Sequence, residues 1–272
     1  MCIRDRGRSE SFNELQPKAS LAYRFHDGLL GYVTVGKGFR AGGFNNLAPG
    51  SNFQPGFDKE SLLSYEVGFK GSTADGRVRA AGSLFYIDYD DQQYFLFDQT
   101  GTQANINVNK SEISGGEFEL NFAASESFQI DAGLGFTDSE ISEYEDIPGV
   151  LVPASAIIGR KVPGAPVWTL NLALQHTQPI GDGLELVSRL DYEHRDKTYW
   201  TLDNLDTQSA YDLTNLSFEL GDDRWRTRLF VNNLFDEDYI DWFFAARFIG
   251  LPADIAWPSA PRQVGLEYSI SF

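Results

Sequence analysis

Aromatic side chains gather in the long polar connections of this 272-residue chain, beside arginine and asparagine. Aromatic faces and guanidinium groups suit planar, anionic molecules, which they hold by stacking, cation–π contacts and charge-assisted hydrogen bonds. Connections carry binding residues more often than regular elements do. The sequence therefore predicts ligand contacts from Arg40, Phe44, Asn45, Tyr94, Phe95, Tyr199, Trp200, Trp242, Phe243 and Arg247. The alternative role for any one of these aromatics is in a girdle at a membrane surface.

The sequence lacks the common catalytic and metal-binding motifs. Its three histidines, His26, His176 and His194, are far apart, and neither G-x-S-x-G nor H-E-x-x-H occurs. The glycine-rich segment 36–43 is no phosphate-binding loop, because its lysine precedes glycine and no helix follows. Acidic runs such as 140–146 offer oxygen ligands for Ca²⁺ but lack the EF-hand glycine spacing. We therefore predict that the protein is not an enzyme and has no catalytic residue, cofactor or resident metal.

The elements that must position the aromatics are strands. At the end of the chain Val264, Leu266, Tyr268, Ile270 and Phe272 alternate with polar residues and glycine. Successive side chains of a strand point to opposite faces, so this segment has one apolar and one polar face. The same alternation recurs in about eleven segments, joined by short turns and long polar connections in turn. That rhythm is typical of a transmembrane barrel, which carries turns on one membrane side and loops on the other.

Composition supports this interpretation. The hydrophobic fraction is 42% and the mean hydropathy is −0.30, as expected when only every second residue of a strand faces lipid. No stretch approaches the about 20 apolar residues that a membrane helix needs. The net charge of −17 argues against nucleic acid as a partner, because phosphate binding requires clustered lysine and arginine. The strand from Arg77 to Phe97 is aromatic on both faces, so its lipid-facing side stays open.

The two ends of the chain lead to different expectations. Residues 1–7 contain the only Met and the only Cys and begin Met-Cys-Ile-Arg-Asp, which is what translation of a common sequencing adapter gives. We predict that 1–7 are a non-native leader and that 8–272 are barrel. Closed bacterial barrels have an even number of strands, so an odd count indicates that the front of the barrel is missing. Phe272 is then the natural end, and the sheet is open at both edges.

Several motifs resemble those of TonB-dependent outer-membrane receptors. These motifs are Val35-Gly36-Lys37-Gly38-Phe39-Arg40-Ala41-Gly42-Gly43-Phe44-Asn45, Ser64-Tyr65-Glu66-Val67-Gly68-Phe69-Lys70, Val162-Pro163-Gly164-Ala165-Pro166 before Trp168-Thr169-Leu170, Val231-Asn232-Asn233-Leu234-Phe235-Asp236-Glu237-Asp238-Tyr239 and the ending Pro261-Arg262 to Phe272. The resemblance covers residues 12–272. The Asn-Asn-Leu-Phe-Asp segment together with the terminal Phe is its most specific part. The resemblance implies an all-β, antiparallel transmembrane barrel of 22 strands, of which this chain supplies about eleven C-terminal ones.

The resemblance also implies function and partners. It implies uptake of a ferric siderophore or similar iron chelate, energised by the TonB complex through an N-terminal plug region that is not visible in this sequence. It implies outer-membrane lipid and lipopolysaccharide as surroundings, and a barrel-assembly machinery that reads Tyr268, Ile270 and Phe272. Alternatives are a passive porin-like channel, uptake of cobalamin or a glycan, and, from another class, a soluble all-β binding module.

Overall fold

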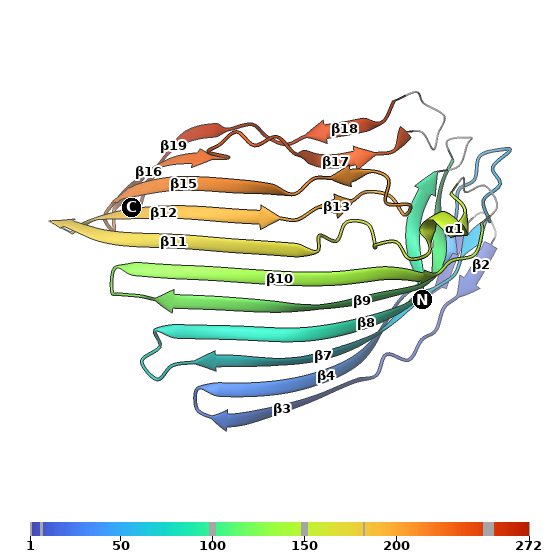
Figure 1. Ribbon diagram of the computed structural model, residues 1–272, viewed down its shortest axis with the longest axis horizontal. Coiled ribbons are helices and arrows are strands. Elements are labelled where there is room, and N and C mark those ends of the chain that lie inside the picture. The colour runs from blue at the N-terminus through green and yellow to red at the C-terminus, as the bar shows by residue number, and fades with distance from the viewer. Residues whose placement is uncertain are drawn as a thin grey trace.

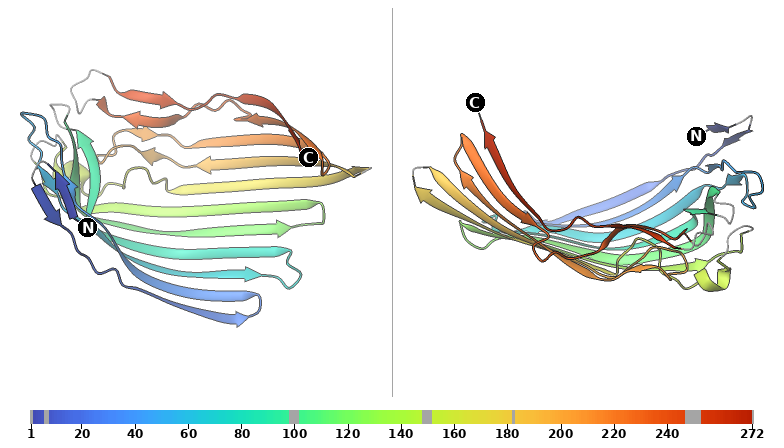
Figure 2. Two further views of the ribbon diagram at one scale, coloured as in Figure 1. Left: turned by 180° about the vertical axis from the view of Figure 1, so that it is seen from behind. Right: turned by 90° about the horizontal axis from the view of Figure 1, so that it is seen from above.

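The computed structural model describes residues 2–5, 8–97, 102–147, 152–181, 183–246 and 253–271, with the side chains of 2–5 left undescribed. Its main element is one antiparallel sheet of eleven strands in which each strand pairs with its neighbours in chain order (Figure 1). The strands are β3 (Lys18–His26), β4 (Leu29–Arg40), β7 (Glu60–Ser72), β8 (Val78–Phe97), β9 (Gln103–Ala123), β10 (Phe128–Glu143), β11 (Trp168–Gly181), β12 (Leu184–Arg195), β15 (Tyr211–Gly221), β16 (Trp225–Asn232) and β19 (Gln263–Ile270). The sheet curves into an open trough with β3 and β19 at its edges (Figure 2). The prediction of about eleven barrel strands in an open antiparallel sheet is confirmed.

Short strand pairs and one short helix lie at the end of the trough that carries the long connections. They are the strand pairs β1 (Cys2–Asp5) with β2 (Arg8–Ser11), β5 (Gly43–Phe44) with β6 (Gly56–Phe57), β13 (Thr198–Tyr199) with β14 (Thr207–Gln208) and β17 (Ile240–Phe244) with β18 (Ile255–Pro258), and the helix α1 (Ala154–Ile157). In the described part of the chain, no helix is both long and apolar enough to cross a membrane.

The two faces of the sheet differ in polarity. Val33, Val67 and Leu84 lie side by side on β4, β7 and β8 and belong to an apolar face whose large side chains are exposed. The opposite face is polar and concave. Side chains on this face, such as Asp131 and Arg189, line a cavity over the middle of the sheet. An apolar face exposed over many strands is what contact with lipid requires.

The register also settles the face of β8 that its sequence leaves open. Leu84 and Tyr86 lie opposite Val67 and Tyr65, on the apolar face. Phe85 lies on the polar face, where its ring covers Gly115 of β9. The lipid-facing side of β8 is therefore the side of Leu84 and Tyr86.

The polar residues from Asp98 to Asn109 predict a long connection after β8, and this prediction is wrong. Strand β9 already begins at Gln103, so β8 and β9 are joined by a short connection. The misleading residues are Asn105 and Asn107, which favour loops in general. Here Ala104, Ile106 and Val108 alternate with them and are buried, so the segment is a strand with one apolar side.

The Asn-Asn-Leu-Phe-Asp segment forms a turn, although the sequence from Trp225 predicts strand as far as Phe235. Strand β16 ends at Asn232, and Asn233 has a φ of 52°. The buried Asn233 side chain donates to the carbonyl oxygens of Glu237 (2.9 Å) and Ala260 (3.3 Å) and accepts from the Glu237 amide (2.8 Å). Asparagine tolerates the left-handed conformation. This one residue therefore joins the end of β16 to the approach to β19.

Replacing Asn233 by alanine should destabilise the full-length receptor by about 2–3 kcal/mol. Alanine loses buried hydrogen bonds and is strained at positive φ. Asn233→Gly should cost less, because glycine keeps the backbone conformation and loses only the bonds. Thermal unfolding of the detergent-purified receptor measures both. Equal midpoints for wild type and Asn233→Ala would contradict this role.

Candidate ligand-binding site

The β8–β9 hairpin extends past its neighbours at the end of the trough that carries the long connections. Strand β7 pairs with β8 only as far as Asp90, and β10 pairs with β9 only from Lys110. Beyond this point Gln92–Phe97 pair with Gln103–Val108 alone, about 20 Å of strand at about 3.3 Å per residue. The tip turns out of the line of the sheet (Figure 1) after Asp91, which has a φ of 55°. The tip of the hairpin therefore extends beyond the ends of the neighbouring strands β7 and β10.

Two kinds of contact hold this hairpin. The side chain of Asn45 donates to the carbonyl oxygen of Asn105 and accepts from its amide, both at 2.9 Å. Beneath it lies a hydrophobic core that joins the hairpin to α1 and the neighbouring connections. That core consists of Phe53, Ala104, Ile106, Val108, Ile141, Tyr144, Ile157, Val162 and Leu202. Burial of these side chains fixes the hairpin against the connections that follow β10 and β12.

A pocket of about 710 Å³ opens beside this core, between the hairpin and three connections. Its size falls in the range of small-molecule sites. The lining residues are Tyr94, Phe95, Leu96, Phe97, Gln103, Val152, Ile157, Pro163, Trp200, Thr201, Leu202, Trp242, Phe243, Phe244, Ala245 and Trp257. We call this set the aromatic pocket.

The rings of the aromatic pocket contact one another in a chain. The Phe97 ring lies edge-on to Phe95 at 5.2 Å and to Phe244 at 4.7 Å between centroids. Trp242 lies parallel to Phe244 at 6.2 Å and edge-on to Trp257 at 4.6 Å. Such pairs hold each other in fixed orientations. The rings therefore form one preassembled surface.

Three of these rings still expose about half of their surface: Phe95 (54%), Trp242 (50%) and Trp257 (49%). Tyr94, by contrast, is largely covered, and burial raises the pKa of its phenol, which donates to Oε1 of Gln92 at 3.0 Å. The indole Nε1 of Trp200 is buried and has no hydrogen-bond partner in the described part of the chain. Exposed aromatic area in a concave site can be covered by a flat ligand.

The structure brings five of the ten predicted ligand residues together in the aromatic pocket: Tyr94, Phe95, Trp200, Trp242 and Phe243. They come from strands β8 and β17 and from the connection after β13, so most lie in strands and not in irregular loops. Trp257 of β18 was not predicted. It stands alone between small residues near the end of a long connection, where no periodic pattern marks it.

The other predicted ligand residues lie outside the pocket. Arg40 pairs with Glu60 at 2.7 Å and donates to the carbonyl oxygen of Gln93 at 3.2 Å. Asn45 is occupied by Asn105, Phe44 lies in β5, and the Tyr199 ring packs under Lys197. Arg247 lies outside the described residues.

The residues expected to signal barrel assembly lie on the last strand. Tyr268 and Ile270 of β19 are exposed on its apolar face, at 64% and 52%. Phe272 lies outside the described residues.

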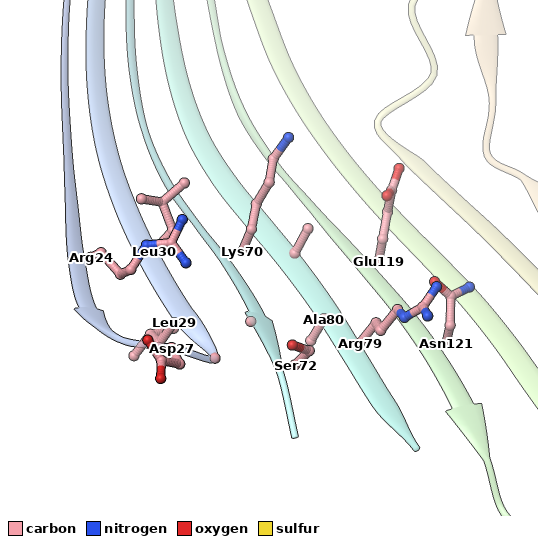
Figure 3. Close-up of a pocket in the computed structure, with 13 residues that line it drawn as sticks. Arg24, Asp27, Leu29, Leu30, Lys70, Ser72, Arg79, Ala80, Glu119 and Asn121 are labelled. Carbon is pink, nitrogen blue, oxygen red and sulfur yellow. The ribbon is translucent and has the colours of Figure 1, made fainter. Parts of the chain in front are cut away.

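A second hollow, of about 430 Å³, lies on the polar face at the opposite end of the trough, beside the short turns (Figure 3). Arg24, Lys70 and Arg79 point into it together with Glu119 and Asn121. None of the three cations forms an ion pair with a described residue. Cationic side chains therefore line the end of the trough away from the aromatic pocket. Across the described ranges, no three His, Cys, Asp or Glu side chains lie close enough to hold a metal ion.

Comparison with known families identifies the sheet. Residues 4–234 match the family described as TonB dependent receptor-like, beta-barrel. The chain belongs to this family. It is therefore part of an outer-membrane β-barrel, and the alternative of a soluble all-β module is excluded. Relatives in the family are receptors and transporters, not enzymes.

Curated relatives and solved structures agree with the family. The chain is 26% identical to the pesticin receptor of Yersinia enterocolitica in an alignment 281 positions long that covers 98% of the chain and 37% of that receptor. It is 26% identical to the ferric-pyoverdine M114 receptor PbuA of Pseudomonas sp. in an alignment 237 positions long that covers 85% of the chain and 27% of that receptor. The ferric yersiniabactin uptake receptor FyuA from Yersinia pestis superposes with a TM-score of 0.81 at 21% identity, covering 97% of the chain and 38% of FyuA. The chain thus spans about a third of the length of these relatives.

Proposed function

We propose that the receptor containing this chain takes up a ferric siderophore or similar iron chelate, with energy supplied through TonB. Membership of the TonB-dependent receptor family and similarity to receptors for ferric pyoverdine and ferric yersiniabactin support the iron chelate as cargo. The aromatic pocket is the single structural observation that carries the proposal for this chain.

The pocket lies where an arriving ligand first meets the protein. It is formed at the end of the sheet that carries the long connections, which in transmembrane barrels of bacteria is the extracellular end. Phe95, Trp242 and Trp257 present about half of their ring surface there, and covering that surface removes apolar area from water. We propose Tyr94, Phe95, Trp200, Trp242 and Phe243 as ligand contacts, with Phe97, Phe244 and Trp257 beside them.

Deletion of the gene for the full-length receptor tests this function. The deletion strain, grown under iron limitation on single ferric chelates, should lose growth on one chelate or a small group, and the plasmid-borne gene should restore it. A second deletion, of tonB, should abolish uptake of the same radiolabelled chelate in the complemented strain. Wild-type growth of the receptor deletion strain on every chelate would remove the iron-uptake proposal, and uptake that survives tonB deletion would favour a passive channel.

A further inference from the structure

The charge of the aromatic pocket restricts the ligand further than the family does. None of the sixteen side chains that line the pocket is charged at neutral pH. This differs from the expectation that arginine and aromatic residues together bind a planar anion. Of the two predicted arginines, Arg40 is held by Glu60 outside the pocket, and Arg247 lies outside the described residues.

Acids adjoin the pocket residues directly in the sequence, whereas the nearest described cation, Lys161, lies two residues before Pro163 and pairs with Asp138. Asp203 and Asp206 follow Trp200 and both accept from the hydroxyl of Thr201, at 2.7 Å and 3.1 Å. Asp241 precedes Trp242. The pKa of Tyr239 is raised mainly by burial of its phenol and, to a smaller extent, by the negative charge of Asp241. The chain as a whole carries a net charge of −17. A polyanionic ligand would be repelled by this field and would lose its water without gaining a counter-charge in the pocket.

The unpaired cations of the trough do not compensate for this. Arg24, Lys70 and Arg79 lie in the hollow beside the short turns, at the other end of the strands (Figure 3). The strands between the two sites are longer than a Debye length of about 8 Å at physiological salt. These cations therefore add little to the potential at the aromatic pocket.

We infer that the aromatic pocket selects an iron chelate that is uncharged or cationic and carries flat aromatic rings, and that it rejects polyanionic chelates of the same shape. This inference rests on the proposed function. The rings of Phe95, Trp242 and Trp257 supply the stacking surface, and the lack of a cation among the described lining residues supplies the charge selectivity.

A matched pair of probes tests the charge selectivity on the full-length receptor. The first probe is the neutral ferric complex of hydroxyquinoline, and the second is its ring-sulfonated, trianionic analogue, which has the same ring system. Quenching of tryptophan fluorescence measures the Kd of each. We expect the neutral complex to bind at least about tenfold more tightly. Equal binding, tighter binding of the sulfonated complex, or no binding of the neutral complex would overturn the inference.

The neutral ferric complex of acetohydroxamate, which has no aromatic ring, tests the aromatic half of the inference. It should bind at least about tenfold more weakly than the neutral hydroxyquinoline complex. Binding of the two neutral complexes with the same Kd would show that the rings do not select aromatic ligands and would overturn that half.

A gain-of-function variant separates electrostatics from misfolding. Gln103 lines the pocket from β9, and Gln103→Lys should strengthen binding of the sulfonated complex about two- to fivefold. Gln178→Lys, at the short-turn end of β11, adds the same charge far from the pocket and should leave both Kd values unchanged. No gain in Gln103→Lys would count against the pocket as the source of selectivity.

Growth on polyanionic chelates alone would overturn this inference and leave the uptake function standing, whereas growth independent of the receptor would overturn the function itself.

Discussion

Replacing Trp242 by alanine should weaken binding of the transported ferric chelate roughly thirtyfold, a loss of about 2 kcal/mol. Trp242 is half exposed and touches both Phe244 and Trp257, so it occupies the middle of the ring surface in the aromatic pocket. Its removal takes away its own stacking area and the support for two neighbouring rings. Binding to the purified full-length receptor gives the Kd, and uptake of radiolabelled chelate at limiting concentration gives the effect in cells.

Trp168→Ala is the matched control for this prediction. Trp168 is similarly exposed (44%) and also contacts one aromatic ring, Phe136, at 4.6 Å, but it lies at the start of β11 outside the aromatic pocket. This variant should bind the chelate like wild type at equal levels of folded receptor. If both variants weaken binding equally, the effect of Trp242→Ala comes from barrel stability and not from ligand contact.

Gly115→Ala should destabilise the barrel by about 1–3 kcal/mol and lower the amount of folded receptor in the outer membrane. A Cβ atom at Gly115 would lie 2.3 Å from the backbone oxygen of Phe136 on β10 and 2.6 Å from the Phe85 ring on β8. The ring could move, but the backbone oxygen belongs to the neighbouring strand and moves only with the sheet. Heat-modifiable migration of outer-membrane extracts measures the folded fraction.

Gly133→Ala provides the comparison within the same part of the sheet. Gly133 lies inside β10, and the nearest atom to an added Cβ is Cβ of Asn171 at 3.9 Å, an ordinary contact. This variant should fold like wild type, so a difference between the two separates crowding from the general effect of replacing a strand glycine. Wild-type folding of Gly115→Ala would mean that β9 and β10 separate more easily than their register suggests.

Most of the sheet could be predicted because strand alternation is a local property. In β19 the apolar residues Val264, Leu266, Tyr268 and Ile270 repeat with period two, and this alone gives strand and face. In β8 the polarity pattern does not distinguish the two faces, because the neighbouring residues Leu84 and Phe85 are both apolar although Leu84 faces the apolar side and Phe85 the polar side. The choice there depends on Gly115 across the sheet, which makes room for the Phe85 ring and lies far away in sequence.

The sequence predicts which types of residue form the candidate site, but it does not predict which individual residues line the pocket. The sequence marks Trp200, Trp242 and Arg40 alike as aromatic or cationic residues near connections. Which of them meet depends on how the connections after β10, β12 and β16 pack against the β8–β9 hairpin. Arg40 is removed from the set by Glu60, and Trp257 is added by its pairing with Trp242 in the β17–β18 hairpin. Neither contact follows from local sequence.

Strand β8 links the wall of the barrel to the ligand site, and this limits how such a site can diversify. Residues 79–90 pair with the wall strand β7, and Tyr94–Phe97 of the same strand line the aromatic pocket. A one-residue insertion between them would turn every following side chain to the other face. Evolution of ligand preference can therefore change β8 by substitution, whereas insertions in the connections 196–210 and 233–262 fall outside the eleven-stranded sheet and leave its register unchanged. Sequence divergence among descendants of this receptor should accordingly concentrate its insertions in those two connections and spare the hairpin.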